Sequence, residues 1–152
     1  MKLRIYIDTS VLGGCEDDEF RVHSRQLVDA FVRGDYTLVL SELALRELAT
    51  APDAVRKVAS MVPEANIELI ALSPEAEELA ERYISEGAVG ARMRADALHI
   101  ALATMARVDV LVSWNFKHIV NLRRIHAYNA VNLKHNYHLL EIRSPRELLD
   151  NE

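Results

Sequence analysis

The chain has 152 residues, of which half are hydrophobic and 27% are charged, and its net charge is −5. This composition is that of an ordinary globular protein, and the length predicts one domain over residues 1–152. No apolar run approaches the ~20 residues of a membrane span. Charged Lys2, Arg4 and Asp8 interrupt the first apolar segment, so we expect no signal peptide. We therefore expect a cytoplasmic protein with no membrane partner, and the single Cys15 fits a reducing compartment.

Charge is divided unevenly along the chain. Residues 1–90 carry 9 Lys or Arg and 17 Asp or Glu, whereas residues 91–152 carry 9 and 6. A basic half beside an acidic site suits a polyanionic substrate, although any one basic residue is better explained as part of a solvated helix face. Four acidic residues, 16–19, directly follow Cys15. Their negative charge favours an unreactive thiol over a nucleophile.

The apolar pattern alternates between two periods along the chain. Short apolar runs, partly β-branched, predict strands at 3–7, 36–40, 67–72 and 109–113. Helical spacing predicts helices at 20–33 (closed by Gly34), 42–50, 52–62 (with Pro52 near its first turn), 74–86 (capped by Ser73), 92–107 and from Ser144 onward. This alternation predicts an α/β fold with a central, mostly parallel sheet of four or five short strands. The Asn and His density of residues 115–138 predicts turns and loop.

Three carboxylates occupy comparable places in this pattern. Asp8 directly follows the first strand, Glu47 lies on the helix after the second, and Asp96 lies in the first turn of the helix before the fourth. Ligands bind at the carboxyl ends of strands in open α/β sheets, and crowded carboxylates are tolerable when they hold a metal ion. Simpler explanations stay open: a cap or turn for Asp8, a solvated charge for Glu47, and the helix dipole for Asp96.

A fourth polar position follows the last predicted strand, in Ser113-Trp114-Asn115-Phe116-Lys117-His118. Asn115 suits a cap, and we expect both aromatic side chains to pack under the loop. His99 lies three residues after Asp96 and shares its helix face. Packing with one hydrogen bond and a catalytic role are equally open for this histidine.

Taken together, these segments resemble the four motifs of the PIN domain family, in the form common among bacterial proteins of the VapC type. The matching segments are Asp8-Thr9-Ser10, Ser41 with Arg46-Glu47-Leu48, Asp96-Ala97-Leu98-His99-Ile100-Ala101, and Leu111-Val112-Ser113-Trp114-Asn115-Phe116-Lys117-His118-Ile119. The resemblance runs from residue 3 to about residue 143. The fold that it implies is a three-layer α/β/α sandwich.

The resemblance also implies an activity, that of a Mg²⁺- or Mn²⁺-dependent ribonuclease that hydrolyses RNA. Carried over by position, Asp8, Glu47, Asp96 and Asn115 become the catalytic residues and metal ligands. Asn115 stands where the family has a fourth acid and brings no charge, so one metal ion or two stay open. Glu42 is the nearest alternative to Glu47, but five residues put the two about 140° apart round a helix.

Further roles follow from the same resemblance. Thr9 or Ser10 orients Asp8 or holds a metal-bound water. On their charge alone, basic side chains of the second half could hold RNA phosphates, namely Arg92, Arg94 or Lys117. The family also implies the toxin of a toxin–antitoxin pair, with an antitoxin protein as partner, and a homodimer.

Two alternatives stay open at this point. Asn115 and the acidic net charge fit a catalytically weak or silent PIN module that binds RNA or a protein partner. Phosphoryl transfer through Asp8 ranks last, because no second aspartate follows it at close spacing.

Overall fold

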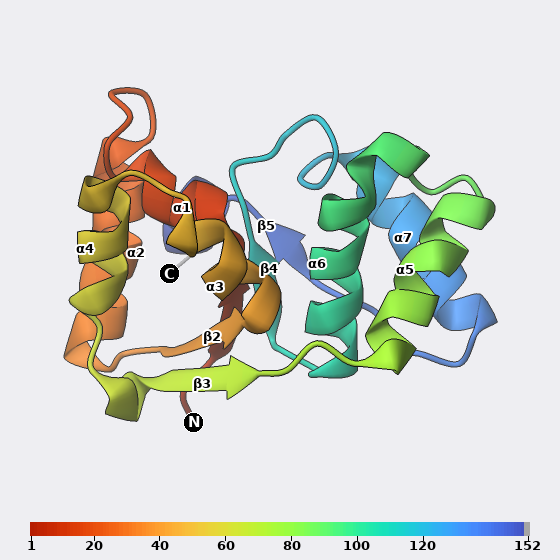
Figure 1. The fold of residues 1–152 in the computed structure, drawn as a ribbon, viewed down its shortest axis with the longest axis horizontal. Helices are drawn as coiled ribbons and strands as arrows, with labels where there is room; N and C mark the ends of the chain where they lie inside the picture. The colour runs from red at the N-terminus through yellow and green to blue at the C-terminus, as the bar shows by residue number, and fades with distance from the viewer. Residues whose placement is uncertain (151–152) are drawn as a thin grey trace.

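Five short strands form one parallel sheet in the order β3-β2-β1-β4-β5, in a computed structural model that describes residues 1–150 (Figure 1). The strands are β1 (Arg4–Ile7), β2 (Thr37–Ser41), β3 (Ile67–Ile70), β4 (Val110–Val112) and β5 (Ile142–Arg143). The four predicted strands are confirmed, and β5 is an addition to them. The predicted domain reaches residue 152, and its last two residues lie outside the described part of the chain.

Helices connect and flank these strands. They are α1 (Thr9–Gly14), α2 (Arg21–Arg33), α3 (Glu42–Ala49), α4 (Asp53–Ser60), α5 (Pro74–Ser85), α6 (Arg94–Met105), α7 (Leu122–Lys134) and α8 (Pro145–Asp150), with 3₁₀ turns η1 (Glu64–Asn66) and η2 (Ala91–Met93). Within residues 1–150, no helix is long and apolar enough to cross a membrane.

The sheet separates two layers of helices, because successive strand residues point to opposite faces. In β1, Tyr6 belongs to the core shared with α5, α6 and α7, whereas Ile5 and Ile7 belong to the core shared with α1, α2 and α4. Figure 1 shows these two groups of helices on either side of the strands. The predicted three-layer α/β/α fold is therefore confirmed.

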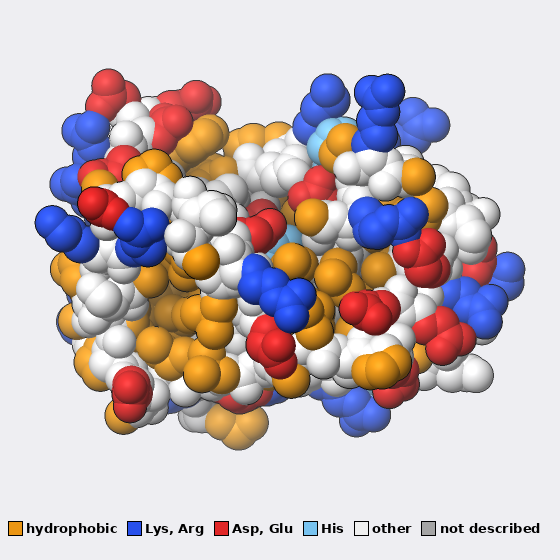
Figure 2. Space-filling model, in the orientation of Figure 1, with side chains coloured by type: hydrophobic (Ala, Val, Ile, Leu, Met, Phe, Trp, Pro, Cys, Tyr) orange, Lys and Arg blue, Asp and Glu red, His pale blue; other side chains and the backbone are white. Residues whose placement is uncertain are grey.

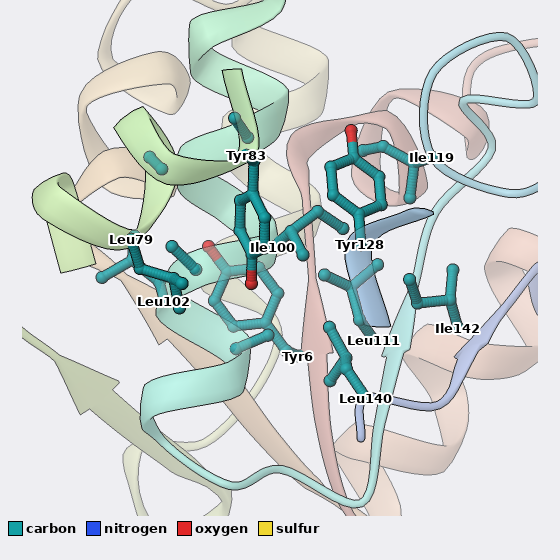
Figure 3. Close-up of a cluster of buried hydrophobic side chains, with 14 of the residues drawn as sticks. Tyr6, Leu79, Tyr83, Ile100, Leu102, Leu111, Ile119, Tyr128, Leu140 and Ile142 are labelled. Atoms are coloured by element: carbon teal, nitrogen blue, oxygen red, sulfur yellow. The ribbon is translucent and has the colours of Figure 1, made fainter. Parts of the chain in front are cut away.

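Three buried tyrosines tie the α5–α7 layer together (Figure 3). Tyr83 and Tyr128 meet edge to face with ring centroids 5.2 Å apart. A buried phenol needs a hydrogen-bond partner. Tyr83 donates to Asn132 Oδ1, and Tyr128 donates to the carbonyl of His118 at 2.9 Å. The second bond fixes the loop after β4 against α7.

Helix ends follow the capping signals in the sequence. The hydroxyls of Ser41 and Ser73 accept hydrogen bonds from the N–H groups three residues on. Ser144 and Glu147 form a reciprocal capping box, with distances of 3.0 and 3.1 Å. Gly34 closes α2 with φ of 81°. Each of these capping signals lies at an observed end of a helix.

The prediction of turns and loop for residues 115–138 is wrong over α7. Asn121 caps this helix by accepting a hydrogen bond from the Arg124 N–H at 2.9 Å. Tyr128, Val131 and Asn132 form its buried stripe. Two of these three are polar or amphipathic, and tertiary hydrogen bonds rather than apolar periodicity make their burial tolerable. The short helix α1, which follows Asp8, is also absent from the sequence prediction.

Candidate active site

The carboxyl edge of the sheet is lined by buried polar side chains. Asp8 directly follows β1, Ser41 ends β2, Ser113 directly follows β4, and Ser144 directly follows β5. Parallel strands bring all of these ends to one edge, where open α/β sheets bind ligands. Buried polar groups need partners, so this edge is held by hydrogen bonds.

Asp8 is fixed by three donors from two segments. Its Oδ1 accepts from the Ser10 N–H at 3.2 Å and from Ser10 Oγ at 2.5 Å. Its Oδ2 accepts from Ser113 Oγ at 2.6 Å. Asp8 is thus the N-cap of α1, and a carboxylate with four acceptor positions still has capacity for a ligand. Burial raises the pKa of Asp8, and Glu47 adds to the rise, against the opposing effects of His99 and the serine hydroxyls.

Glu47 reaches the same edge from α3. Its Oε1 lies 2.8 Å from His99 Nε2 and accepts from Thr9 Oγ1 at 3.3 Å. Glu42, on the same helix, turns away and accepts from the Leu72 N–H at 3.2 Å. Of the two glutamates that the sequence left as candidates, Glu47 is the one that the structure brings to Asp8.

His99 is a buried link between Glu47 and the core. Its Nδ1 lies 2.6 Å from Tyr6 Oη, which lies 2.8 Å from Ser41 Oγ. Burial holds the pKa of Tyr6 far above its ordinary value, so the phenol keeps its proton. A carboxylate at Nε2 and a phenol at Nδ1 favour the tautomer with hydrogen on Nε2. The i+3 spacing from Asp96 was the one sequence signal for this residue.

Asp96 lies in the first turn of α6 and is electrostatically coupled to Asp8. Burial raises its pKa, the negative charge of Asp8 raises it further, and His118, His99 and a hydrogen bond from Asn115 oppose the rise. Only the amide nitrogen of Asn115 can donate that bond. Its amide oxygen accepts from the His118 N–H at 2.9 Å. Asn115 therefore links Asp96 to the loop after β4.

The acidic side chains fit a hard divalent cation in their chemistry. Asp8 and Asp96 repel each other, and a cation between them would relieve that repulsion. Among residues 1–150, no group of three or more His, Cys, Asp and Glu side chains is arranged to hold a metal ion. Mg²⁺ keeps several waters and needs only one or two carboxylates, so the pair Asp8 and Asp96 satisfies its usual requirement.

The other candidate residues divide into those at the edge and those outside it. Ser10 contacts Asp8 and Thr9 contacts Glu47, as described above. Lys117 is exposed on the loop beside Asn115, and Arg92 is exposed on η2 before Asp96. Arg94 instead forms an ion pair with Glu81.

Two further residues complete the account of the site. The hydroxyl of Ser113, which holds Asp8, is a contact that the sequence analysis did not assign, and its position after a strand was the available signal. Cys15 is buried, and its pKa rises to about 11, chiefly through burial rather than through its acidic neighbours. The expectation of an unreactive thiol holds, with burial as the larger cause.

The chain has a PIN-type α/β/α fold with an acidic group at the carboxyl edge of its sheet. The fold is shared with three solved structures. A VapBC2 structure from Rickettsia felis, bound to a promoter DNA fragment, matches with a TM-score of 0.56 and 12% identity, over 93% of this chain and 98% of that one. VapC20 from Mycobacterium tuberculosis, described as a sarcin-ricin loop cleaving toxin, matches with 0.56 and 15%, over 74% and 91%.

The third structure is FitAB bound to a DNA fragment, with a TM-score of 0.57 and 11% identity, over 93% of this chain and 94% of that one. No family model and no curated protein matches the chain by sequence. The PIN-type fold implied by the four motifs is confirmed by these structures.

Proposed function

We propose that this protein is a metal-dependent endoribonuclease that hydrolyses RNA phosphodiester bonds. The observation that carries the proposal is the electrostatic coupling of Asp8 to Glu47 and of Asp8 to Asp96, from three separate segments, at the carboxyl edge of a parallel sheet. Asp8 and Asp96 have raised pKa values there, and the groups that oppose the rise are histidines, serine hydroxyls and the Asn115 amide, with no lysine or arginine among them. Buried carboxylates need a positive partner. Since no lysine or arginine supplies one here, a divalent cation is the partner that the site favours.

Each residue has a distinct role in the proposal. Asp8 and Asp96 would hold Mg²⁺ or Mn²⁺, with Asp8 oriented by Ser10 and Ser113. When bound, the ion would polarise the scissile phosphate and activate a water. Glu47 is held by His99 through Oε1, which leaves Oε2 to face water or substrate. Asn115 orients Asp96 through its amide nitrogen. Glu47 and the oxygen of Asn115 stay proposed as the further ligands of the ion.

The solved structures with this fold support the biological setting. VapC20 is described as an RNA-loop cleaving toxin, and VapBC2 and FitAB are complexes bound to DNA. By this likeness we propose an RNA substrate and an antitoxin protein as partner for the present chain. The homodimer is proposed from the family resemblance of the sequence alone.

A catalytically silent module that binds RNA or a protein is the second candidate. The observation in its favour is Asn115, which replaces a charged ligand and whose oxygen already accepts a backbone hydrogen bond. Such a module would bind RNA without cutting it. It would also show weak affinity for Mn²⁺.

Cleavage of single-stranded RNA by the purified protein with Mn²⁺ tests the first candidate against the second. We expect cleavage that EDTA stops and that Asp8→Asn and Asp96→Asn abolish, whereas Glu42→Gln, on the far side of α3, cuts normally. Calorimetry should show Mn²⁺ binding that Asp8→Asn weakens. Intact RNA in the presence of Mn²⁺, or equal cleavage by the two aspartate variants, would rule the nuclease out.

A further inference from the structure

An exposed aromatic ring stands beside the acidic edge. The expectation that both aromatic side chains of the loop after β4 are packed is correct for Trp114, which is buried, and wrong for Phe116, whose exposed fraction is 48%. Phe20 stacks on Trp114 with centroids 4.2 Å apart and planes 18° from parallel. Phe116 lies 6.0 Å from Trp114 and 6.4 Å from Phe20. The three rings form one group, which we call the aromatic stack, and Phe116 is its solvent-exposed end.

Contacts with α1 and α2 hold the aromatic stack rigidly on its buried side. Trp114 donates its indole N–H to Ser24 Oγ at 2.8 Å, and Ser24 Oγ donates to the Val11 carbonyl at 2.7 Å. A Cβ at Gly14 would lie only 2.7 Å from Trp114 Nε1, so the indole lies directly against the backbone of α1. A rigid ring loses little conformational entropy when a ligand packs against it.

Hydrogen bonds also join the aromatic stack to the acidic group. The Trp114 N–H donates to Ser10 Oγ at 2.9 Å, and the same Oγ donates to Asp8. Asn115, between the two rings in sequence, donates its N–H to Ser113 Oγ at 2.9 Å, the hydroxyl that also donates to Asp8, and its side chain lowers the pKa of Asp96. Asn121 Nδ2 holds the carbonyls of Phe116 and Lys117 at 2.9 and 3.1 Å. Phe116 is therefore fixed in place relative to both aspartates.

Charge around Phe116 is opposite on its two sides. Lys117 follows it in the loop, and Arg123 is exposed at the start of α7. The acidic residues 16–19 precede Phe20 on the other side. Figure 2 shows acidic side chains over the α1–α2 connection, basic side chains over the loop after β4, and hydrophobic side chains between them. A polyanion laid across Phe116 is attracted to the basic side and repelled from the acidic one.

We propose that Phe116 is a base-stacking site for an unpaired nucleotide of single-stranded RNA, whose phosphates lie toward Lys117. An exposed phenyl ring backed by two further rings offers the flat surface on which splayed bases stack, and a neighbouring cation holds the backbone. The proposal rests on the proposed function, since it names how that site takes its substrate. It restricts the substrate to RNA segments whose bases are not paired.

Binding of a fluorescein-labelled oligouridylate, measured by anisotropy in EDTA so that no cleavage occurs, tests this site. We expect Phe116→Ala to weaken binding about 10-fold, as for other base–aromatic contacts, and Phe116→Tyr to bind as the wild type does. Leu133→Ala, which shortens an exposed apolar side chain of α7 elsewhere, is the matched control and should bind normally. An abasic ribose-phosphate chain of equal length should bind the wild type and Phe116→Ala equally.

Trp114 provides a second readout, because it is the only tryptophan of the chain. Its emission should change when oligouridylate is added to the wild type and should not change in Phe116→Ala. Equal oligouridylate affinity of Phe116→Ala and wild type, an equal loss for the abasic chain, or no binding by the wild type would overturn the proposal. If Mn²⁺ yields no cleavage while Phe116→Ala still weakens binding, the nuclease proposal fails and the stacking site stands.

Discussion

The two edges of the same sheet differ in how their charged side chains are paired. At the amino edge, Arg4 of β1 reaches across to Glu68 of β3 with two contacts of 2.5 and 2.9 Å, and it donates further to the Ala106 carbonyl at 3.0 Å. At the carboxyl edge, Asp8 and Asp96 meet hydroxyls, an amide and histidines. One edge pairs its charges within the chain, and the other gathers carboxylates whose pKa values are raised.

This difference separates stability from function. A bidentate arginine–carboxylate pair is satisfied as it stands and needs no ligand. Two coupled carboxylates in a buried setting are satisfied only when a proton or a cation joins them. Changes at the amino edge should therefore alter stability alone, whereas changes at the carboxyl edge should alter chemistry first.

The largest expected effect is on catalysis at the carboxyl edge. Glu47→Gln and Asp96→Asn should each lower the rate of Mn²⁺-dependent RNA cleavage by roughly 100-fold or more, as expected when a catalytic group is lost. Glu42→Gln and Glu68→Gln, which change glutamates outside the site, should keep the wild-type rate. A loss in Glu68→Gln as large as that in Glu47→Gln would remove the distinction between the edges.

The next effect concerns the packing that holds the carboxyl edge. Gly14→Ala places a Cβ against Ser24 Oγ and 2.7 Å from Trp114 Nε1, so these groups must shift. We expect a loss of about 1–3 kcal/mol in the free energy of unfolding, measured with urea. Gly13→Ala, one residue earlier in α1 with nothing within 4 Å of the new Cβ, is the matched control and should not destabilise the protein.

A smaller effect should appear in the pH dependence of stability without metal. Because the folded pKa of Asp8 is raised above its ordinary value of 3.8, the folded state binds more protons than the unfolded state between these two values. The free energy of unfolding must then fall as pH rises through this window. In EDTA, thermal melts of Asp8→Asn should show a smaller fall than those of the wild type. An equal fall in both would show that Asp8 does not titrate abnormally.

The smallest effect is expected at the amino edge. Glu68→Gln removes the charge of a partly exposed ion pair, whose two side chains are 32% and 38% exposed. Solvent screening limits the loss to about 1 kcal/mol or less, measured by urea unfolding in low salt. High salt should reduce the difference between the variant and the wild type. A loss comparable with that of Gly14→Ala would mean that the pair is more than a local contact.

The sequence predicted the sheet better than the helical layers. Apolar runs with β-branched residues marked four strands, because β1, β2 and β4 are largely buried and the apolar residues of edge strand β3 continue the same local pattern. The sequence did not predict helix α7, because this helix buries Tyr128 and Asn132. Their partners, the His118 carbonyl and Tyr83, lie in other segments. The sequence did not predict strand β5, because only two of its residues pair with β4. Both are decided by contacts between distant segments, which a local pattern does not contain.

For the site, the sequence by itself determined which carboxylates stand near strand ends, since chain position fixes the edge at which Asp8 and Asp96 emerge. Only the tertiary structure chose Glu47 over Glu42, buried His99 between Glu47 and Tyr6, and left Phe116 exposed beside packed Trp114. Burial, hydrogen-bond partners and charge coupling depend on residues 35 to 105 positions apart in the chain. Residues so far apart in the chain come into contact only when the sheet forms, and those contacts determine the chemistry of the carboxyl edge.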